Sequence, residues 1–290
     1  MTRSAMLRAA PRGCVWEPGF GGLALVLSVL GCIGCANDGK VNGKDADGGR
    51  NDAGIPGNDA GGVAAKNLVV DLALNDATSS TAFRGWPLIL MGVAVLAEEG
   101  NAQVVLDPAS LSVRVTSGSE ERRWPLDLLS SVPENTIVDV AHRQVDVFWS
   151  MTADQTRALT PGKYAAELSF ANRVSLPLPI EIADAPAILT AEERSRKAAL
   201  EIQDALLRNE PSRAVGLADA ALADQPDDTG LLVWKAMAHE AAGALDTAFA
   251  TLEAARAEFN QQNPVQDEPP VTIDEAHQRV RSKLSAGSLP

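Results

Sequence analysis

The sequence predicts an α+β multidomain protein, an antiparallel β-sandwich followed by an α-helical hairpin repeat. Between residues 66 and 185, short runs of alternating apolar and polar residues are separated by turn residues, which is typical of antiparallel strands. From residue 190 to residue 263 the apolar period changes to three and four, and small residues recur 34 positions apart. A recurrence of that length is typical of stacked helix pairs.

The chain begins with a positively charged leader and an apolar run. Arg3, Arg8 and Arg12 precede an uncharged stretch over residues 21–30. A charged start followed by an apolar segment of this length is the pattern of a secretory signal peptide. The stretch is too short to cross a bilayer, which takes about 20 apolar residues. We therefore predict that residues 1–31 are a signal peptide.

Two cysteines, Cys32 and Cys35, follow the apolar run, each directly after a glycine. Residues 29–32 (Val-Leu-Gly-Cys) resemble the lipobox of bacterial lipoproteins, in which the cysteine is acylated and becomes the new N-terminus. The resemblance implies a protein anchored in the cell envelope through lipid on Cys32, or alternatively on Cys35. Ile33, and not Asp, follows Cys32, which by the same resemblance favours the outer membrane, facing the periplasm or the cell surface. An ordinary cleaved signal with incidental cysteines is the competing interpretation.

A glycine- and asparagine-rich segment separates the cysteines from the first predicted strand. Residues 36–65 hold eight Gly, five Asp and four Asn and no aromatic residue, so they have almost nothing to bury. Such a segment cannot recover its ordering entropy, and we predict a disordered tether over residues 32–65 that spans about 30 Å. Asp45 and Asp47 begin like a calcium loop, but Arg50 and Pro56 stand where that loop needs Gly and Glu, so no metal site is expected.

The charge balance excludes one class of partner. The formal net charge is −13, and removal of the leader, with three Arg and one Glu, would make it −15. Nucleic acid is not an expected partner, because its binding depends on Lys and Arg that neutralise phosphates. Only Cys35 would remain beside a lipidated Cys32, so no internal disulfide is expected.

Seven or eight short strands are predicted in the sandwich region. The expected strands cover residues 67–74, 86–96, 111–115, 137–151, 164–170 and 174–182, with a turn at 117–119 toward 122–124. Residues 159–164 place the only tyrosine, Tyr164, after a Pro-Gly turn at the head of a strand. This resembles the corner of immunoglobulin-like or fibronectin-like sandwiches, where a tyrosine hydroxyl bonds to nearby backbone. The resemblance implies a core position for Trp149; a flat sheet packed on helices is the competing fold.

The helical region starts with a capping signal and then repeats. Thr190 and Glu193 form a predicted capping box. The recurring pairs are Asn209 and Gly243, Ala214 and Ala248, Ala218 and Leu252, and Ala221 and Ala255. This spacing resembles that of the tetratricopeptide repeat, a pair of antiparallel helices. Pro226 matches the closing proline of the first unit, whereas the second unit has Asn260 there and Pro264 four residues later.

Two repeats bury too little surface to stand alone, so their ends need cover. Residues 274–284 predict a terminal helix that covers one end, within a capping region over residues 264–290. The sandwich would cover the other end. We therefore expect the two regions to pack together.

No catalytic or nucleotide-binding motif was found, so the expected function is binding, with no enzyme activity and no cofactor. The repeat resemblance implies a concave face that takes a protein or peptide partner in the envelope. Carried over by position, that face holds Arg196, Ala199, Gln203, Leu206, Val233, Met237 and Glu240. Leu206, Val233 and Met237 are alternatively core residues. The competing function is glycan or cell-wall binding with a helical buttress, which an exposed Trp86 or Trp124 in a groove would favour.

Overall fold

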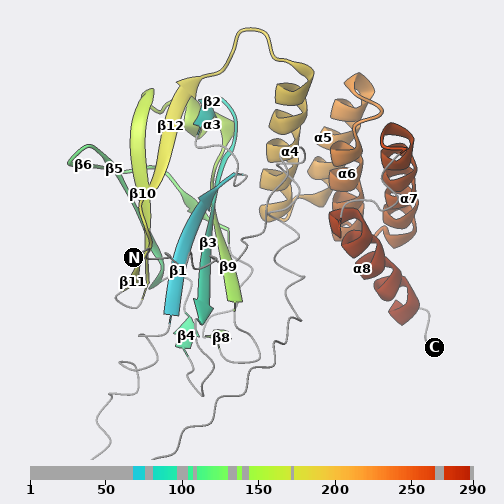
Figure 1. The fold of residues 1–290 in the computed structure, drawn as a ribbon, viewed down its shortest axis with the longest axis horizontal. Coiled ribbons are helices and arrows are strands. Elements are labelled where there is room, and N and C mark those ends of the chain that lie inside the picture. Colours follow the sequence, from blue (N-terminus) through green and yellow to red (C-terminus); the bar gives the residue numbers. More distant parts are fainter. Residues whose placement is uncertain are drawn as a thin grey trace, which may run out of the picture.

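The computed structural model describes residues 68–75, 81–96, 104–106, 110–129, 136–138, 144–170, 173–264 and 271–287. The predicted signal peptide, the two candidate lipid-bearing cysteines and the tether lie outside these residues. The described chain is α+β, with strands over its first part and most of its helices after residue 190 (Figure 1). In this part of the chain, no helix combines the length and apolar character needed to cross a membrane.

Two sheets and a small separate ladder make up the described β region. The first sheet has the order β1 (Leu68–Leu74), β3 (Leu88–Leu96), β9 (Gln144–Met151), β7 (Asp127–Leu128). The second has the order β2 (Thr81–Arg84), β12 (Leu178–Asp184), β10 (Gly162–Phe170), β5 (Ser112–Ser117), β6 (Glu120–Arg122), with β11 (Arg173–Val174) paired to β10. The ladder joins β4 (Val104–Leu106) to β8 (Thr136–Val138).

The expectation of a purely antiparallel arrangement is wrong at one edge. β2 pairs in parallel with β12, with Thr81 opposite Glu181, so the second sheet is mixed. The run predicted over 137–151 is also divided between β8 and β9. Alternation did not reveal β2, β4 or β7, because strands of two to four residues are too short to display a period of two.

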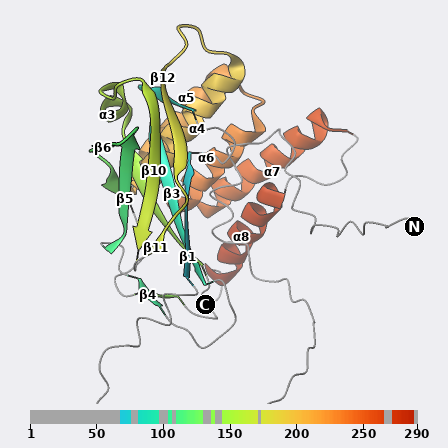
Figure 2. The ribbon, with the colours of Figure 1, turned by 60° about the vertical axis from the view of Figure 1, so that its left-hand side comes forward.

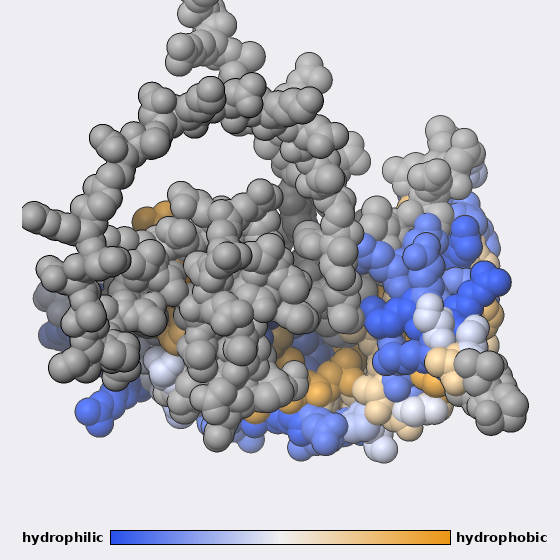
Figure 3. Space-filling model, turned by 90° about the horizontal axis from the view of Figure 1, so that it is seen from below, coloured by the Kyte–Doolittle hydropathy of each residue, from blue (hydrophilic) through white to orange (hydrophobic). Residues whose placement is uncertain are grey.

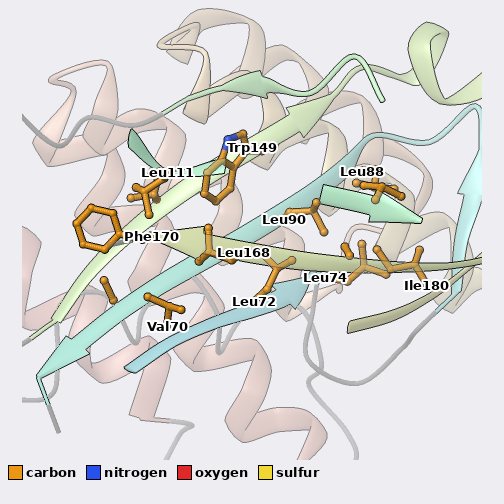
Figure 4. Packing of buried hydrophobic residues seen from close by; sticks show 14 of the residues in the cluster. Val70, Leu72, Leu74, Leu88, Leu90, Leu111, Trp149, Leu168, Phe170 and Ile180 are labelled. Carbon is orange, nitrogen blue, oxygen red and sulfur yellow. The ribbon is translucent and has the colours of Figure 1, made fainter. Parts of the chain in front are cut away.

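The two sheets share one apolar core, formed by the inward residues of β1, β3 and β9 on one side and β5, β10 and β12 on the other (Figure 4). Trp149 is 5 % exposed within this core, which confirms its predicted position. Gly92 of β3 lies against the Trp149 ring: a Cβ built there would be 2.6 Å from a ring carbon. The glycine therefore leaves the space that the indole fills.

The tyrosine after the Pro-Gly turn forms the expected bond. The Tyr164 hydroxyl donates to the Thr160 carbonyl at 2.7 Å. Trp124 packs edge-on to the Tyr164 ring, with the centroids 5.2 Å apart. The short helix α3 (Ala153–Arg157), which precedes this turn, was not expected from the sequence. Its capping box of Thr152 and Gln155 is a signal that the sequence contains.

Longer helices follow the sheets in the described chain. They are α4 (Ala191–Leu207), α5 (Pro211–Asp224), α6 (Thr229–Ala241), α7 (Leu245–Gln262) and α8 (Val271–Gly287). The capping box at the start of α4 is confirmed: the Glu193 N–H donates to Thr190 Oγ1 at 3.2 Å, and the Thr190 N–H donates to the Glu193 carboxylate at 2.7 Å.

The backbone geometry of the first helix pair, α4 and α5, recurs in the second, α6 and α7. Asn209 and Gly243, in the turns within the two pairs, both have positive φ, at 57° and 76°. The Glu210 N–H donates to the Ala205 carbonyl at 2.8 Å, and at the equivalent place the Ala244 N–H donates to the His239 carbonyl at 2.9 Å. The recurring small residues Ala214 and Ala248 are both 0 % exposed. The recurrence in the sequence is therefore a recurrence in structure.

The second helix pair ends later than the first. The C-cap of α5 is Gln225, and the equivalent place in the second pair is Phe259, which still lies inside α7. The C-cap of α7 is Asn263. Pro226 and Pro264 directly follow the two caps. The displaced proline therefore marks a second helix that continues for about one more turn.

The helical stack is covered at both ends (Figure 2). The predicted terminal helix is present as α8, with wider bounds, and packs on α7 through Ile273, Ala276 and Val280. At the other end, α4 contacts the first sheet. The apolar core of the helical stack is separate from the core between the sheets.

Candidate functional site

The sheet region and the helices meet at an apolar junction. Trp86 lies just before β3, and Ile89 lies near the start of that strand. Both side chains pack against Leu200 of α4, and all three residues are buried. Phe148 and Leu207 pack around them. The expected packing of the two regions against each other is confirmed.

A buried polar cluster lies at the same junction and joins four residues from β7, β9 and the end of α4. Ser150 Oγ donates to Asp204 Oδ1 at 2.6 Å, and Arg208 Nε donates to the same oxygen at 2.9 Å. Arg208 Nη1 also donates to Asp127 Oδ2 at 3.1 Å. Asp204 is 2 % exposed. Burial alone would lower the pKa of Arg208, but Asp204 and Asp127 outweigh it and raise that pKa. Sequence reasoning missed this cluster, because no local pattern brings these residues together.

The residues predicted to bind a partner do not form one open face. Arg196 faces the sheet, and its Nη2 donates to the Thr81 carbonyl at 3.3 Å. Val233 is 0 % exposed inside the helical core, so its assignment to a partner face is corrected to the core alternative. Gln203 is 4 % exposed, and no described residue accepts a hydrogen bond from its Nε2.

The other four predicted residues lie on α4 and α6, partly covered. Ala199, Leu206 and Met237 are half-buried and pack on the helical core. The Glu240 side chain is 8 % exposed and accepts from Arg279 Nη2 and Lys283 Nζ of α8, each at 2.8 Å.

Burial alone would raise the pKa of Glu240, but the hydrogen bonds from Arg279 and Lys283 outweigh it and lower that pKa. This carboxylate is therefore already neutralised, and the accessible charge beside it is the half-exposed Lys283 ammonium.

From below, the described surface beside the helices is largely hydrophilic, with an apolar area toward the middle of the molecule (Figure 3).

The aromatic residues that would mark a glycan site are not arranged as one. Trp86 is 3 % exposed at the junction. Trp124 is half-buried and packs on the core and on Tyr164. Neither indole forms an open stacking platform, so the glycan-binding alternative gains no support.

Among the described residues, no group of three or more His, Cys, Asp or Glu is placed to hold a metal ion. His277 pairs with Glu253 and lies on Phe249, with ring centroids 4.6 Å apart. Burial and the nearby Lys235 ammonium lower the pKa of His239, against a smaller opposing effect of Asp219.

Comparison of the chain with protein-family models, curated proteins and solved structures finds no match.

Proposed function

We propose that this chain is a non-enzymatic, lipid-anchored protein of the cell envelope and an interaction platform for another protein, with a role in assembly of an envelope complex. In this proposal, the two sheets are an immunoglobulin-like sandwich and α4–α7 are two tetratricopeptide-like units. The anchor is Cys32, with Cys35 as the alternative, in the outer membrane. The tether of residues 32–65 would let the platform stand away from the membrane surface.

The recurrence of backbone hydrogen bonds at equivalent places in the two helix pairs carries the proposal. It supports two equivalent units, in which α4 and α6 are the first helices. In tetratricopeptide proteins the first helices line the surface that takes extended peptides or partner helices. Leu206 and Met237 are half-buried on these helices, and Lys283, which pairs with Glu240 of α6, has a side chain that is 54 % exposed. Met suits such a surface, because its flexible thioether adapts to different partners.

A photo-crosslinking amino acid at Met237 tests the interaction surface in intact cells. The control places the same amino acid at Ala220, which is exposed on α5. The expected result is a discrete crosslinked protein from the position-237 variant and none from the position-220 variant. Identical adduct patterns from both positions, or no adduct from either, would contradict the proposal.

Metabolic labelling with a palmitate analogue tests the anchor separately. Cys32→Ser is expected to abolish label and release the protein from the membrane fraction, whereas Cys35→Ser should keep both. Loss of label only in Cys35→Ser would move the anchor to the alternative cysteine. Absence of label from the unsubstituted protein would overturn the lipoprotein assignment.

A further inference from the structure

The edge strand β1 has a side that no strand of the described residues covers. β1 is the end strand of the first sheet, and its ladder partner is β3. In an antiparallel pair, the backbone groups of alternate residues point to the partner strand and the others point away. The residues of β1 that do not bond to β3 therefore direct their backbone N–H and C=O groups toward the free edge.

A hydrogen bond at the end of β1 identifies the residues that face β3. The Asn75 N–H donates to the Ile89 carbonyl across the pair at 2.7 Å. Backbone groups alternate in direction along a strand, so those of residues 69, 71 and 73 also face β3. The backbone groups of residues 68, 70, 72 and 74 face the free edge. Accordingly, the Leu72 N–H bonds to no strand carbonyl of the described residues and donates to the Asp71 carboxylate at 2.8 Å. A side-chain oxygen thus occupies the place that a strand carbonyl would take.

Exposed apolar side chains gather on both sides of this edge. β1 lies alongside β11 of the second sheet (Figure 1). Val69 of β1 is 52 % exposed, Val174 of β11 is 59 % exposed, and Leu176 just after β11 is 82 % exposed. These are three of the five large hydrophobic side chains that are exposed in the described part of the chain. An unpaired strand with apolar borders is a template for pairing with another strand.

We propose that the free edge of β1 binds an extended segment of a partner protein by antiparallel strand addition. The segment would place apolar residues opposite 68, 70, 72 and 74 and a Lys or Arg opposite Asp71. On binding, the Leu72 N–H would donate to a carbonyl of the segment, which releases the Asp71 carboxylate to pair with the cation. This site is separate from the helical surface and the anchor, so its failure would leave that proposed function standing.

Charge favours a cationic segment over a second copy of this chain. The formal net charge of −13 opposes self-association. Antiparallel pairing of two β1 strands centred on Asp71 would also place two carboxylates opposite each other, and like charges directly opposite destabilise a strand pair.

The test uses the full chain and a fluorescent heptapeptide of sequence Val-Thr-Val-Lys-Val-Thr-Val, which places its lysine opposite Asp71 when it pairs antiparallel to β1. Replacing the lysine by glutamate is expected to weaken binding about fivefold. N-methylation of the third and fifth residues removes the N–H groups that face β1 and should weaken binding at least about tenfold. N-methylation of the second and sixth residues, whose N–H groups point away, should leave affinity within about twofold.

Two exposed-site variants of the protein complete the test, with thermal melting to verify that each is folded. Asp71→Lys should reverse the preference between the lysine and glutamate peptides, and Asp71→Asn should remove the preference but keep the binding. Equal affinity for the two N-methylated isomers, or no binding at millimolar peptide, would overturn strand addition. A concentration-dependent dimer that the peptide disperses would assign the edge to a second copy and overturn the proposal as well.

Discussion

Gly92 illustrates how one residue determines the packing of the sheet core. It is opposite Val147 in the β3–β9 pair, and its missing side chain leaves room for the Trp149 ring. A Cβ at this position would also lie 2.9 Å from a methyl carbon of Leu168, which belongs to the opposite sheet. Both neighbours are held inside the core, so neither can move aside without repacking.

Gly92→Ala is therefore expected to destabilise the protein by about 1–3 kcal/mol, the usual cost of overpacking. The matched control is Gly216→Ala within α5, where the added Cβ would meet no described atom within 4 Å beyond the neighbouring residues and backbone of its own helix. Because Ala is a better helix former, the control should stabilise by about 0.5–1 kcal/mol. Urea unfolding midpoints measure both effects. A change in stability in the same direction for both variants would contradict this account of the core.

At the scale of elements, α4 depends on its first turn. Thr190 accepts from the Glu193 N–H and its own N–H is satisfied by the Glu193 carboxylate. These reciprocal bonds satisfy amide donors that the helix itself leaves without partners. Since α4 also contacts the sheet, its start fixes where the helical stack begins.

Thr190→Ala should lower the free energy of unfolding by about 1 kcal/mol. Glu192→Gln, at a neighbouring exposed position outside the capping box, is the control and should change it by no more than a few tenths of that. Denaturant unfolding measures both variants. An equal loss in the two would show that the loss comes from first-turn charge and not from the cap.

The α6–α8 contact should depend on acidity through Glu240. Because the pKa of Glu240 is lowered from its ordinary value of 4.5, the folded state favours its charged form. The contribution is present above pH 4.5 and is lost as the pH falls through the lowered pKa. Glu240→Gln should therefore destabilise by about 1–3 kcal/mol near neutral pH, and the difference from the unsubstituted protein should shrink in acid. Unfolding midpoints across pH test this, and a difference that stays constant would contradict it.

At the scale of the whole molecule, the junction cluster fixes how the helices sit on the sheet. The contacts of Trp86, Ile89 and Leu200 bury apolar surface between the sheet and α4. Asp204 fixes the orientation of the helix, because its carboxylate bonds to both Ser150 and Arg208. A buried ion pair adds little net stability but is costly to break by removing one partner. Asp127, with a side chain 46 % exposed, is the solvent-facing end of the cluster.

Asp204→Ala is accordingly expected to destabilise by about 3–5 kcal/mol and to speed amide exchange in both α4 and β9. Asp127→Ala should cost less than about 1 kcal/mol, because the partly exposed pair is screened by water. Hydrogen exchange with mass spectrometry separates the two. Faster exchange confined to α4 in Asp204→Ala would show that the cluster stabilises the helix and not the junction.

Features that depend on neighbours in the sequence were predictable. Alternation located most of the longer strands, the capping box located the start of α4, and the Pro-Gly-Lys-Tyr turn predicted the Tyr164 hydrogen bond. The recurrence of small residues predicted matching turns at Asn209 and Gly243. In each case the determining contacts lie close together in the chain, or repeat the same local solution, so the pattern is visible before folding.

Tertiary structure alone decided the features that join distant segments. The parallel pairing of β2 with β12 brings together residues far apart in the chain, such as Thr81 and Glu181. The burial of Val233 and Gln203 and the cluster around Asp204 likewise depend on which faces meet after the helices pack against each other and against the sheet. A side chain carries no local mark of the partner it will meet across the fold, because only the packing of whole elements brings the two together.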